Sequence, residues 1–314
     1  MTLSQLRAYV AVATSGSVRG AADKLVVSQP AVSAAVAALQ RELGVTLLSR
    51  NGRGLQLTPA GRVFAGYARQ LLGLLDEATA ATTGQEHPEQ GRVRLAAVTT
   101  AGEHVLPRFL ASFRDKYPEA EVLLEVGNKV RVWDLLEHRE VDLAIGGRPP
   151  GGGRLTSLAT RPNVLVLVAA GNGKGPHSRD VSVHELGSQT LLLREAGSGT
   201  RSTAEELFDE LGLSPRTLTV GSNGAIRESV QVGLGITLIS RDAVARELEM
   251  GTLEEWCCPT LPRHRAWHLV ARAGDELPAT AALFLNHITG PGADGFRLVG
   301  GREDQPFSRL PTPG

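Results

Sequence analysis

The spacing of apolar residues changes once along this chain of 314 residues, and that change constrains the fold more than any other feature. Up to about residue 83, apolar side chains recur every three or four positions, which is the period of amphipathic helices. Residues 92–289 instead alternate short apolar runs with helical patterns, as βαβ units do. The polar segment 84–91, which contains a proline and is flanked by glycines, separates the two parts and is predicted to be a hinge.

The first part of the chain has the helix-capping residues that a three-helix unit needs. Helices are expected over residues 3–14, 18–25 and 29–43. Ser28 can cap the third helix, Pro30 fits its first turn, and Gly44 suits its C-terminal end. Two short strands around a glycine-rich tip follow and predict a hairpin. Together these signals predict a winged helix-turn-helix over residues 1–58.

Charge is distributed unevenly between the two parts. The whole chain carries 33 Lys and Arg against 33 Asp and Glu, so its formal charge is zero. Residues 1–70 contain eight Lys and Arg and only two Asp and Glu, a balance of plus six, so the remainder carries minus six. A basic module joined to an acidic body indicates binding to double-stranded DNA.

The third expected helix buries apolar residues spaced four, three and four apart, namely Val32, Val36, Leu39 and Leu43. The side chains left outside near its N-terminal end are Gln29, Ser33, Ala34 and Ala37. Gln can pair with adenine through two hydrogen bonds, so this end of the helix is predicted to enter the major groove. Arg53 at the hairpin tip is expected to reach the minor groove, whereas Lys24 and Arg50 are expected to contact phosphates. The alternative is a plain three-helix packing motif with a solvated basic face.

A long helix is expected over residues 59–83, with Thr58 at its N-cap and Pro59 at its first position. Its apolar residues step by three and four and form a seam, namely Phe64, Tyr67, Leu71, Leu74 and Ala78. Because the other side of the helix is mostly small or polar, this seam is predicted to pair with the same seam of a second copy. The seam thus predicts a homodimer.

The second part of the chain is predicted to be an α/β domain with a largely parallel sheet, because strand and helix patterns alternate from its first residues. A strand is expected over residues 164–169. Residues 290–314 are rich in Gly and Pro with little apolar periodicity, and they are predicted to be a disordered tail.

Polar residues at strand-to-helix turns form a candidate ligand site. The glycine-rich turn 197–201 (GSGTR) precedes an expected helix, where free backbone N–H groups bind anions. Ligands of open α/β sheets bind at the carboxyl ends of the strands, so other turns can converge on the same cleft. The candidates are Thr99, Thr100, Asn128, Arg148, Ser198, Gly199, Thr200, Arg201, Asn223 and Ala225, with Arg227 as a further cation. The alternative is that these are ordinary capping turns.

Residues 1–66 closely resemble the N-terminal domain of LysR-type transcriptional regulators, and the resemblance continues to about residue 289. It is carried by LRAYVAVATSGSVRGAADKLVVSQPAVSAAVAALQRELGVTLLSR and by LQLTPAGRVF, in which SQPAVS combined with LTPAG is very specific. The resemblance implies that Gln29, Pro30 and Ser33 approach bases and that Arg53 belongs to the wing. It also implies pairing through the long linker helix, as a homodimer or as a homotetramer built from two dimers. Position 34 is Ala, where the family often has a larger polar residue.

The second part resembles a type 2 periplasmic-binding-protein fold, with an effector cleft between two subdomains. The implied boundaries are 92–162 with 268–289 for subdomain I, and 163–267 for subdomain II. Thr99, Thr100 and the turns 198–201 and 223–225 match positions that line this cleft in the family. The segments REAGSGTR, AIRESVQVGLGITLISRDAV and HLVARAG are most similar to the branch that regulates Calvin-cycle genes, whose members respond to phosphorylated metabolites or reduced nicotinamide cofactors. The resemblance therefore implies a small anionic effector, not identified further.

Two other classes of protein share parts of this pattern. An enzyme on a doubly wound fold would need an acid, base, nucleophile or metal constellation, and no such motif is found in the sequence. A solute-binding protein would need an export signal and would not need residues 1–83. The only cysteines, Cys257 and Cys258, are adjacent, which fits a reducing compartment, and no apolar run reaches the length of a membrane span.

The expected fold is a multidomain α+β arrangement of a winged helix-turn-helix, a long dimerising linker helix and a two-subdomain α/β effector domain. The expected function is a cytoplasmic, sequence-specific transcription regulator rather than an enzyme. Its expected partners are double-stranded DNA, a small anionic metabolite, a second copy of itself and RNA polymerase. No cofactor, metal ion or membrane is expected to take part.

Overall fold

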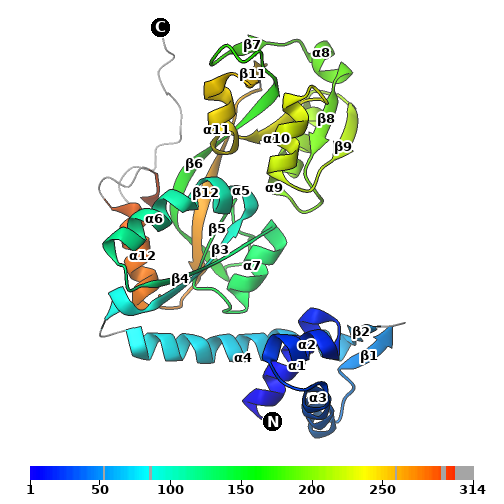
Figure 1. Cartoon of the computed structure of the whole chain (residues 1–314), viewed down its shortest axis with the longest axis vertical. Helices are drawn as coiled ribbons and strands as arrows, with labels where there is room; N and C mark the ends of the chain where they lie inside the picture. The colour runs from blue at the N-terminus through cyan, green and yellow to red at the C-terminus, as the bar shows by residue number, and fades with distance from the viewer. Residues whose placement is uncertain (52–53, 85–86, 259, 291–294, 301–314) are drawn as a thin grey trace.

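The computed structural model describes residues 1–51, 54–84, 87–258, 260–290 and 295–300 (Figure 1). Its N-terminal domain consists of α1 (Leu3–Ser15), α2 (Val18–Leu25), α3 (Gln29–Leu43) and the antiparallel strands β1 (Leu48–Asn51) and β2 (Gly54–Leu57). The long helix α4 (Pro59–Gly84) follows directly. The predicted helix-turn-helix, hairpin and linker helix are confirmed. None of the described helices is long and apolar enough to cross a membrane.

Local signals explain where α3 begins and ends and which face it buries. The Ser28 hydroxyl accepts a hydrogen bond from the Ala31 N–H at 3.3 Å, and Gly44 ends the helix with φ of 68°, which glycine adopts without strain. Three of the four positions predicted to be buried lie in the core that α1 and α2 share with α3. The prediction is wrong for Leu43, which is 36% exposed because it is the last residue before the solvated C-cap.

The C-terminal domain contains a nine-stranded sheet in the order β4–β3–β5–β12–β6–β11–β7, with β10 and β13 also paired to β6. Its strands are β3 (Arg92–Val98), β4 (Glu121–Gly127), β5 (Leu143–Gly146), β6 (Leu155–Ala170), β7 (Ser178–Asp180), β10 (Thr237–Ser240), β11 (Leu253–Cys257), β12 (Arg263–Arg272) and β13 (Arg297–Leu298). A separate parallel pair is formed by β8 (Thr190–Leu193) and β9 (Arg216–Thr219). The remaining elements are η1 (Pro88–Gln90), α5 (Thr99–His104), α6 (Leu106–Lys116), α7 (Lys129–Glu137), α8 (Val183–Ser188), α9 (Gly199–Glu210), α10 (Asn223–Gln231), α11 (Arg241–Met250) and α12 (Ala279–Thr289).

The two long strands β6 and β12 run between the two halves of this domain. They pair with each other antiparallel, and further along β6 pairs antiparallel with β10 and β11. The prediction of a largely parallel sheet is therefore wrong for these strands, although β3, β4 and β5 are parallel. The reason is connectivity: the chain crosses to the second half in one strand and returns in the other, so the two crossing strands oppose each other. β6 also begins well before residue 164, where the strand was predicted to start.

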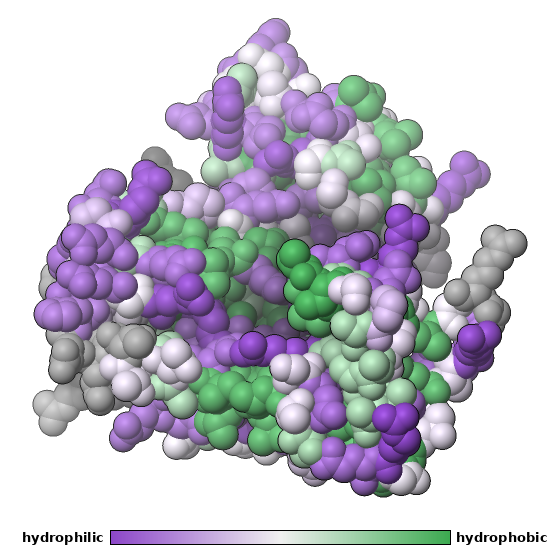
Figure 2. All heavy atoms as spheres, turned by 60° about the horizontal axis from the view of Figure 1, so that its bottom comes forward, coloured by the Kyte–Doolittle hydropathy of each residue, from purple (hydrophilic) through white to green (hydrophobic). Residues whose placement is uncertain are grey.

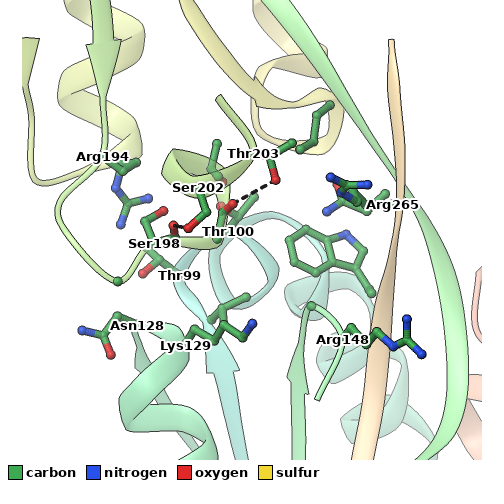
Figure 3. Close-up of a pocket in the computed structure, with 18 of the residues that line it drawn as sticks. Thr99, Thr100, Asn128, Lys129, Arg148, Arg194, Ser198, Ser202, Thr203 and Arg265 are labelled. Atoms are coloured by element: carbon green, nitrogen blue, oxygen red, sulfur yellow. Dashed lines mark hydrogen bonds between the residues drawn. The ribbon is translucent and has the colours of Figure 1, made fainter. Parts of the chain in front are cut away.

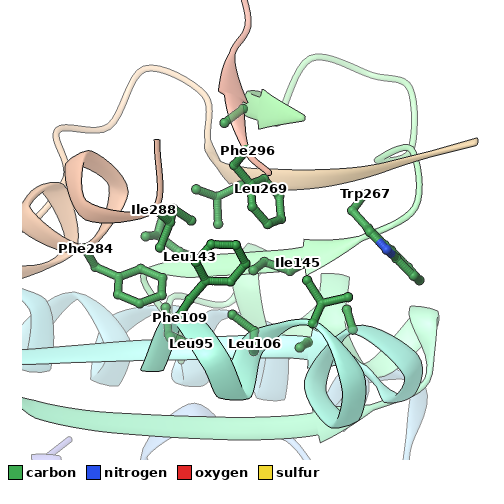
Figure 4. Close-up of a cluster of buried hydrophobic side chains, with 14 of the residues drawn as sticks. Leu95, Leu106, Phe109, Leu143, Ile145, Trp267, Leu269, Phe284, Ile288 and Phe296 are labelled. Atoms are coloured by element: carbon green, nitrogen blue, oxygen red, sulfur yellow. The ribbon is translucent and has the colours of Figure 1, made fainter. Parts of the chain in front are cut away.

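Each half of the C-terminal domain has its own apolar core. We keep the name subdomain I for the half that contains β3, β4 and β5. There Phe109, Leu143 and Phe284 pack in one cluster with Leu269 of β12 (Figure 4). In subdomain II, side chains such as Leu167 of β6 and Phe208 of α9 pack together. β6 contributes to both cores, so its middle is the natural place for a change of angle between the two subdomains.

The segment after α12 contains structure that the sequence analysis missed. Residues 295–300 fold back onto subdomain I, where β13 pairs with β6 and the side chain of Phe296 is 2% exposed. The prediction of disorder over 290–314 is therefore wrong for these residues, whereas 291–294 and 301–314 lie outside the described residues. The reason is that one aromatic side chain and two strand residues suffice to dock a segment, which a composition argument cannot detect.

Helix α4 is held against subdomain I by two ion clusters. The Arg69 guanidinium donates to both carboxylate oxygens of Asp134, at 3.1 and 2.7 Å. About two turns further along, the Glu77 carboxylate accepts hydrogen bonds from Arg139 and Arg272, each at 2.8 Å. We call these two ion clusters together the linker joint. It fixes the direction of the long helix beneath subdomain I, with the N-terminal domain at one end and subdomain II farthest from it (Figure 1).

Candidate functional site

The outer face of α3 carries the predicted base-reading residues. Gln29, Pro30, Ser33 and Ala34 are all exposed, on the side of the helix away from its buried apolar residues. Lys24 at the end of α2 and Arg50 in β1 are also exposed, and no ion pair to either is found within the described part of the chain. Arg53 lies outside the described residues. Small and amide side chains at the end of α3 can approach base edges in a DNA groove. Exposed cations without a carboxylate partner beside them can bind the phosphates.

Hydrogen bonds within the N-terminal domain fix the wing and α4 relative to its helices. The side-chain oxygen of Gln40 in α3 accepts hydrogen bonds from the N–H groups of Leu47 and Leu48, at 2.8 and 3.2 Å. The fully buried Tyr9 hydroxyl donates to the carbonyl of Gly61 in α4 at 2.7 Å. Burial raises the pKa of Tyr9 to about 12, so its hydroxyl remains a donor at every physiological pH. The N-terminal domain and the start of α4 therefore form one rigid body.

A cleft of about 540 Å³ lies between subdomains I and II (Figure 3). Seven of the ten predicted effector residues line it, namely Thr99, Thr100, Asn128, Arg148, Ser198, Gly199 and Thr200. They come from the carboxyl ends of β3, β4, β5 and β8, the edge where ligands of open α/β sheets bind. The convergence of these turns on one cavity is what the sequence predicts.

The other three predicted residues do not line this cleft. Arg201 points along its own helix and pairs with Glu205 at 2.8 Å. Asn223 is 1% exposed and donates a hydrogen bond to the Thr100 hydroxyl at 3.1 Å, so it joins the two subdomains from behind the cavity. Ala225 is exposed on α10, where its N–H is used by the helix cap. Although these residues follow the carboxyl ends of strands, the orientation of each helix about its own axis turns their side chains away from the cleft. The sequence does not reveal that orientation.

Two helices direct their N-terminal ends into the cleft. Ser198 and Gly199 begin α9, with Gly197 at φ of 89°, and Thr99 begins α5 on the opposite wall. Free backbone N–H groups and the positive ends of the helix dipoles favour a negative group at this point.

Cations outnumber carboxylates in the cleft lining. The charged lining residues are Lys129, Arg148, Arg194, Arg265, Glu195 and Glu206. Arg194, 5% exposed, donates to both oxygens of Glu195 at 2.8 and 3.0 Å, and Arg265 pairs with Glu206 at 3.0 Å. Although burial alone raises the pKa of Glu195, the hydrogen bonds from Arg194 lower it, so this pair stays ionised. Lys129 and Arg148, both on subdomain I, have no carboxylate partner among the described residues, so the cleft keeps a positive excess.

Three of these cations and two neighbouring aromatic side chains were missed by the sequence analysis. Lys129 directly follows Asn128, and Arg194 lies three residues before the turn 197–201, so both are close in sequence to turns that were identified. Arg265, Trp267 and His268 lie within β12, a strand that crosses the cleft floor and carries no turn signal. Burial, and then the charge of Arg148, lower the pKa of His268, so the ring is neutral at neutral pH.

Metal and thiol chemistry find no support in this part of the molecule. Over the described residues, no group of three or more His, Cys, Asp or Glu is arranged to hold a metal ion. Cys257 and Cys258 are free thiols, half-buried and buried respectively, and burial raises the pKa of Cys257, which disfavours the reactive thiolate. The cavity thus offers binding groups for an anion.

Two family descriptions match the chain. Residues 86–290 match the LysR substrate binding domain, and residues 3–62 match the bacterial regulatory helix-turn-helix protein of the lysR family. The chain belongs to the LysR family. It is therefore a DNA-binding transcriptional regulator with an effector-binding domain, and the matched relatives are named as regulators, not enzymes.

Individual LysR-family proteins are similar over nearly their whole length. The chain is 35% identical over 284 residues to the HTH-type transcriptional regulator CbbR of Rhodospirillum rubrum, covering 89% of this chain and 93% of that protein. It is 32% identical over 289 residues to the RuBisCO operon transcriptional regulator of Allochromatium vinosum, covering 92% and 95%.

Two solved structures are similar to this chain. Full-length CbnR in complex with its target DNA matches with a TM-score of 0.65 at 23% identity, over 92% of this chain and 99% of that one, which shows the fold alone. The regulatory domain of Synechocystis PCC6803 CcmR in complex with 2-PG matches with a TM-score of 0.56 at 31% identity, over 63% of this chain and 95% of that one.

Proposed function

We propose that this LysR-family regulator is controlled by a small anionic metabolite that binds in the cleft between its two subdomains. The observation that carries the proposal is the positive excess of the cleft: the unpaired Lys129 and Arg148 on one wall, opposite the N-terminal end of α9 on the other. An anion held by α9 would attract both cations and so draw the walls together. The relative CcmR, solved with 2-PG, is consistent with a ligand of this class.

The proposed response is a change in the angle between subdomains I and II that alters how the protein holds DNA. β6 and β12, the two crossing strands, would bend, and α4 would transmit the result to the N-terminal domains of a paired molecule. We propose that the protein acts on DNA in the cytoplasm, contacts RNA polymerase at its promoters, and regulates carbon-fixation genes, as the names of its relatives suggest.

The ligand proposal is tested by titrating the protein with 2-PG and with inorganic phosphate in a calorimeter. Lys129→Gln and Arg148→Gln should each weaken binding about tenfold, since each removes one charged hydrogen bond. Arg154→Gln is the control, because Arg154 is 80% exposed and lies outside the cleft lining. Equal loss in all three variants, or no binding of either anion by the unaltered protein, would overturn the proposal.

The DNA proposal is tested by fluorescence anisotropy with the region upstream of the protein's own gene and with a scrambled duplex. Gln29→Ala should reduce the preference for the upstream region about tenfold, because one amide that can pair with a base is lost. Lys24→Gln should weaken binding to both duplexes alike and lower the salt slope by about one. Arg41→Ala, at the exposed far end of α3, is the control. If Arg41→Ala, and not Gln29→Ala, reduced the preference for the upstream region, the C-terminal end of α3 would face the bases and the assigned orientation would be wrong.

The pairing proposal rests on an apolar stripe of α4 that remains exposed. Its residues are Val63, Tyr67, Leu71 and Leu74, exposed by 64%, 64%, 49% and 49%. Figure 2, in which the lower face of Figure 1 is turned forward, shows hydrophobic patches among hydrophilic side chains on this face. The predicted seam residue Phe64 instead packs on Tyr9 within its own chain, with ring centroids 5.4 Å apart. Leu71→Glu should give a monomer in sedimentation velocity, whereas Gln70→Glu, the same charge on the adjacent face, should leave the oligomer intact.

A further inference from the structure

The segment 295–300 lies outside the region that matches the LysR substrate binding domain, which ends at residue 290. It nevertheless forms a strand: Arg297 and Leu298 of β13 pair with Thr160 and Ala159 of β6, and the Val299 N–H donates to the Leu158 carbonyl at 2.9 Å. β12 pairs with these same residues of β6 from the other side. β13 therefore covers the second edge of β6 just before that strand crosses to subdomain II.

An aromatic side chain anchors this segment in subdomain I. Phe296 is buried, and its ring meets the ring of Phe109 edge-on, with centroids 5.8 Å apart. Figure 4 shows Phe296 inserted beside Leu269 of β12, above Phe109 of α6. The segment is thus tied to the same core that supports the two crossing strands.

The glycine that precedes this anchor touches the side chain that links the subdomains. A methyl group on Gly295 would lie 2.8 Å from Cδ and 2.9 Å from Nε of Arg161, so the arginine stem lies directly against this glycine. The Arg161 guanidinium in turn donates to both carboxylate oxygens of Asp242, at 2.8 and 2.9 Å. Asp242 belongs to the first turn of α11, in subdomain II. The C-terminal segment therefore supports an ion pair that crosses from one subdomain to the other.

The same carboxylate connects this ion pair to the cleft. The indole N–H of Trp267, which lines the cleft, donates to Asp242 at 3.2 Å. Arg161 and Asp242 are 14% and 22% exposed, so little solvent screens their attraction. A second polar contact of the crossing, the Ser240 hydroxyl with the side-chain oxygen of Asn163 at 2.8 Å, lies beside it. A change of angle that moves α11 away from the Arg161 end of β6 would strain or break the Arg161–Asp242 pair.

We propose that residues 295–300 form a strap that holds Arg161 on Asp242 and so restrains the angle between the two subdomains in the absence of a ligand. The strap acts on the edge of β6 that β12 does not cover. It sets how readily the cleft changes shape, because the ion pair that it supports ends on the residue that fixes Trp267. The C-terminal segment would thus affect how easily the subdomains move, whereas other residues bind the ligand.

Hydrogen exchange followed by mass spectrometry on the full chain, with no ligand added, tests the strap. In Gly295→Ala the new methyl group displaces Arg161, whereas in Gly300→Ala it meets no atom within 4 Å. Both glycines have positive φ, 150° and 92°, so the control also places alanine in a strained conformation. Gly295→Ala should speed amide exchange about tenfold at residues 159–164 and 240–245, as expected when one charged hydrogen-bonded pair weakens. Equal exchange in the two variants would overturn the proposal.

A second variant separates the strap from general destabilisation. Arg161→Gln removes the ion pair directly and should speed exchange at the same residues. If the strap acts through Arg161, adding Gly295→Ala to this variant should change the exchange no further, because the two substitutions share one interaction. An additional increase of the same size in the double variant would show that the segment acts elsewhere and would reject the proposed path.

Discussion

Replacing Gly66 and Gly73 of α4 by alanine, one at a time, should have opposite effects on stability. The two glycines lie on the same side of the helix, two turns apart, and both face the end of α7. A methyl group on Gly66 would lie 3.5 Å from the nearest atom, Nε2 of His138, which is an ordinary contact. A methyl group on Gly73 would lie 2.7 Å from both Cβ and the carbonyl oxygen of Arg139.

The magnitudes follow from these distances. Alanine stabilises the interior of a helix by about 1 kcal/mol relative to glycine, so both variants gain this much within α4. In Gly73→Ala, however, α4 and Arg139 must move apart by roughly 0.7 Å, from 2.7 Å to the 3.4 Å of an ordinary contact, and such overpacking costs about 1–3 kcal/mol. The displacement also pulls Arg139 away from Glu77 and so weakens the linker joint. Gly73→Ala should therefore be less stable than Gly66→Ala by about 1–3 kcal/mol.

Thermal unfolding of the full chain measures this difference. Gly66→Ala should raise the Tm by about 2–4 °C, and Gly73→Ala should leave it unchanged or lower it by a similar amount. Limited proteolysis of residues 84–91 should become faster only in Gly73→Ala, because the joint holds the end of α4. If both variants raise the Tm equally, the linker joint does not form in solution and the reasoning fails.

Three further predictions concern contacts elsewhere in the chain. The hydrogen bond with Asp134 raises the pKa of His138 above its usual 6.5, so this pair stabilises the protein fully below that pH and less as pH rises through the raised value; urea unfolding should show this loss, and His138→Gln should abolish it. Gln40→Ala should cost about 2 kcal/mol in the same assay and loosen the hairpin in hydrogen exchange, because two wing N–H groups lose their acceptor. Asn223→Ala should lower the Tm and weaken 2-PG binding, because the Arg194 guanidinium loses one of its acceptors, the one behind the cleft; unchanged 2-PG affinity would contradict this.

The N-terminal domain could be predicted almost entirely from the sequence, because its structure is local. Ser28 caps α3 and Gly44 ends it, and a run of three and four apolar steps determines which face is buried. The strand-to-helix turns of the cleft were also accessible, since the carboxyl ends of neighbouring strands must meet at one edge. Phe64 shows the limit of this approach: its helical spacing fits either a seam between copies or contact with its own domain, and only the packing of Tyr9 decides.

The contacts that could not be predicted join segments far apart in the chain. Trp267 reaches the cleft because β12 returns across it, and Asn223 is withdrawn from the cleft because Arg194 and Thr100 hold its amide. Phe296 depends on a cavity formed by α6 and β12, which no local pattern reveals. Each of these placements depends on contacts between distant segments, and the sequence carries no local signal for them.

The two faces of α4 bear on how a signal can leave the cleft. The residues that face subdomain I are Gly66, Arg69, Gly73 and Glu77, and the exposed apolar residues are Val63, Tyr67, Leu71 and Leu74. The linker joint binds α4 to subdomain I, so the N-terminal domain, α4 and subdomain I form one body. A change in the cleft moves subdomain II relative to this body. Within a single chain, that movement leaves the direction of α3 relative to subdomain I unchanged.

The response of DNA binding to a ligand must then pass through contacts between copies. A monomeric Leu71→Glu variant is accordingly expected to bind 2-PG with the affinity of the unaltered protein, because the cleft is complete within one chain. Its residual DNA binding in the anisotropy assay should not change when 2-PG is added, whereas that of the Gln70→Glu control should. A monomer whose DNA binding still responds to 2-PG would show that α4 moves relative to subdomain I, and that the linker joint opens when the cleft is occupied.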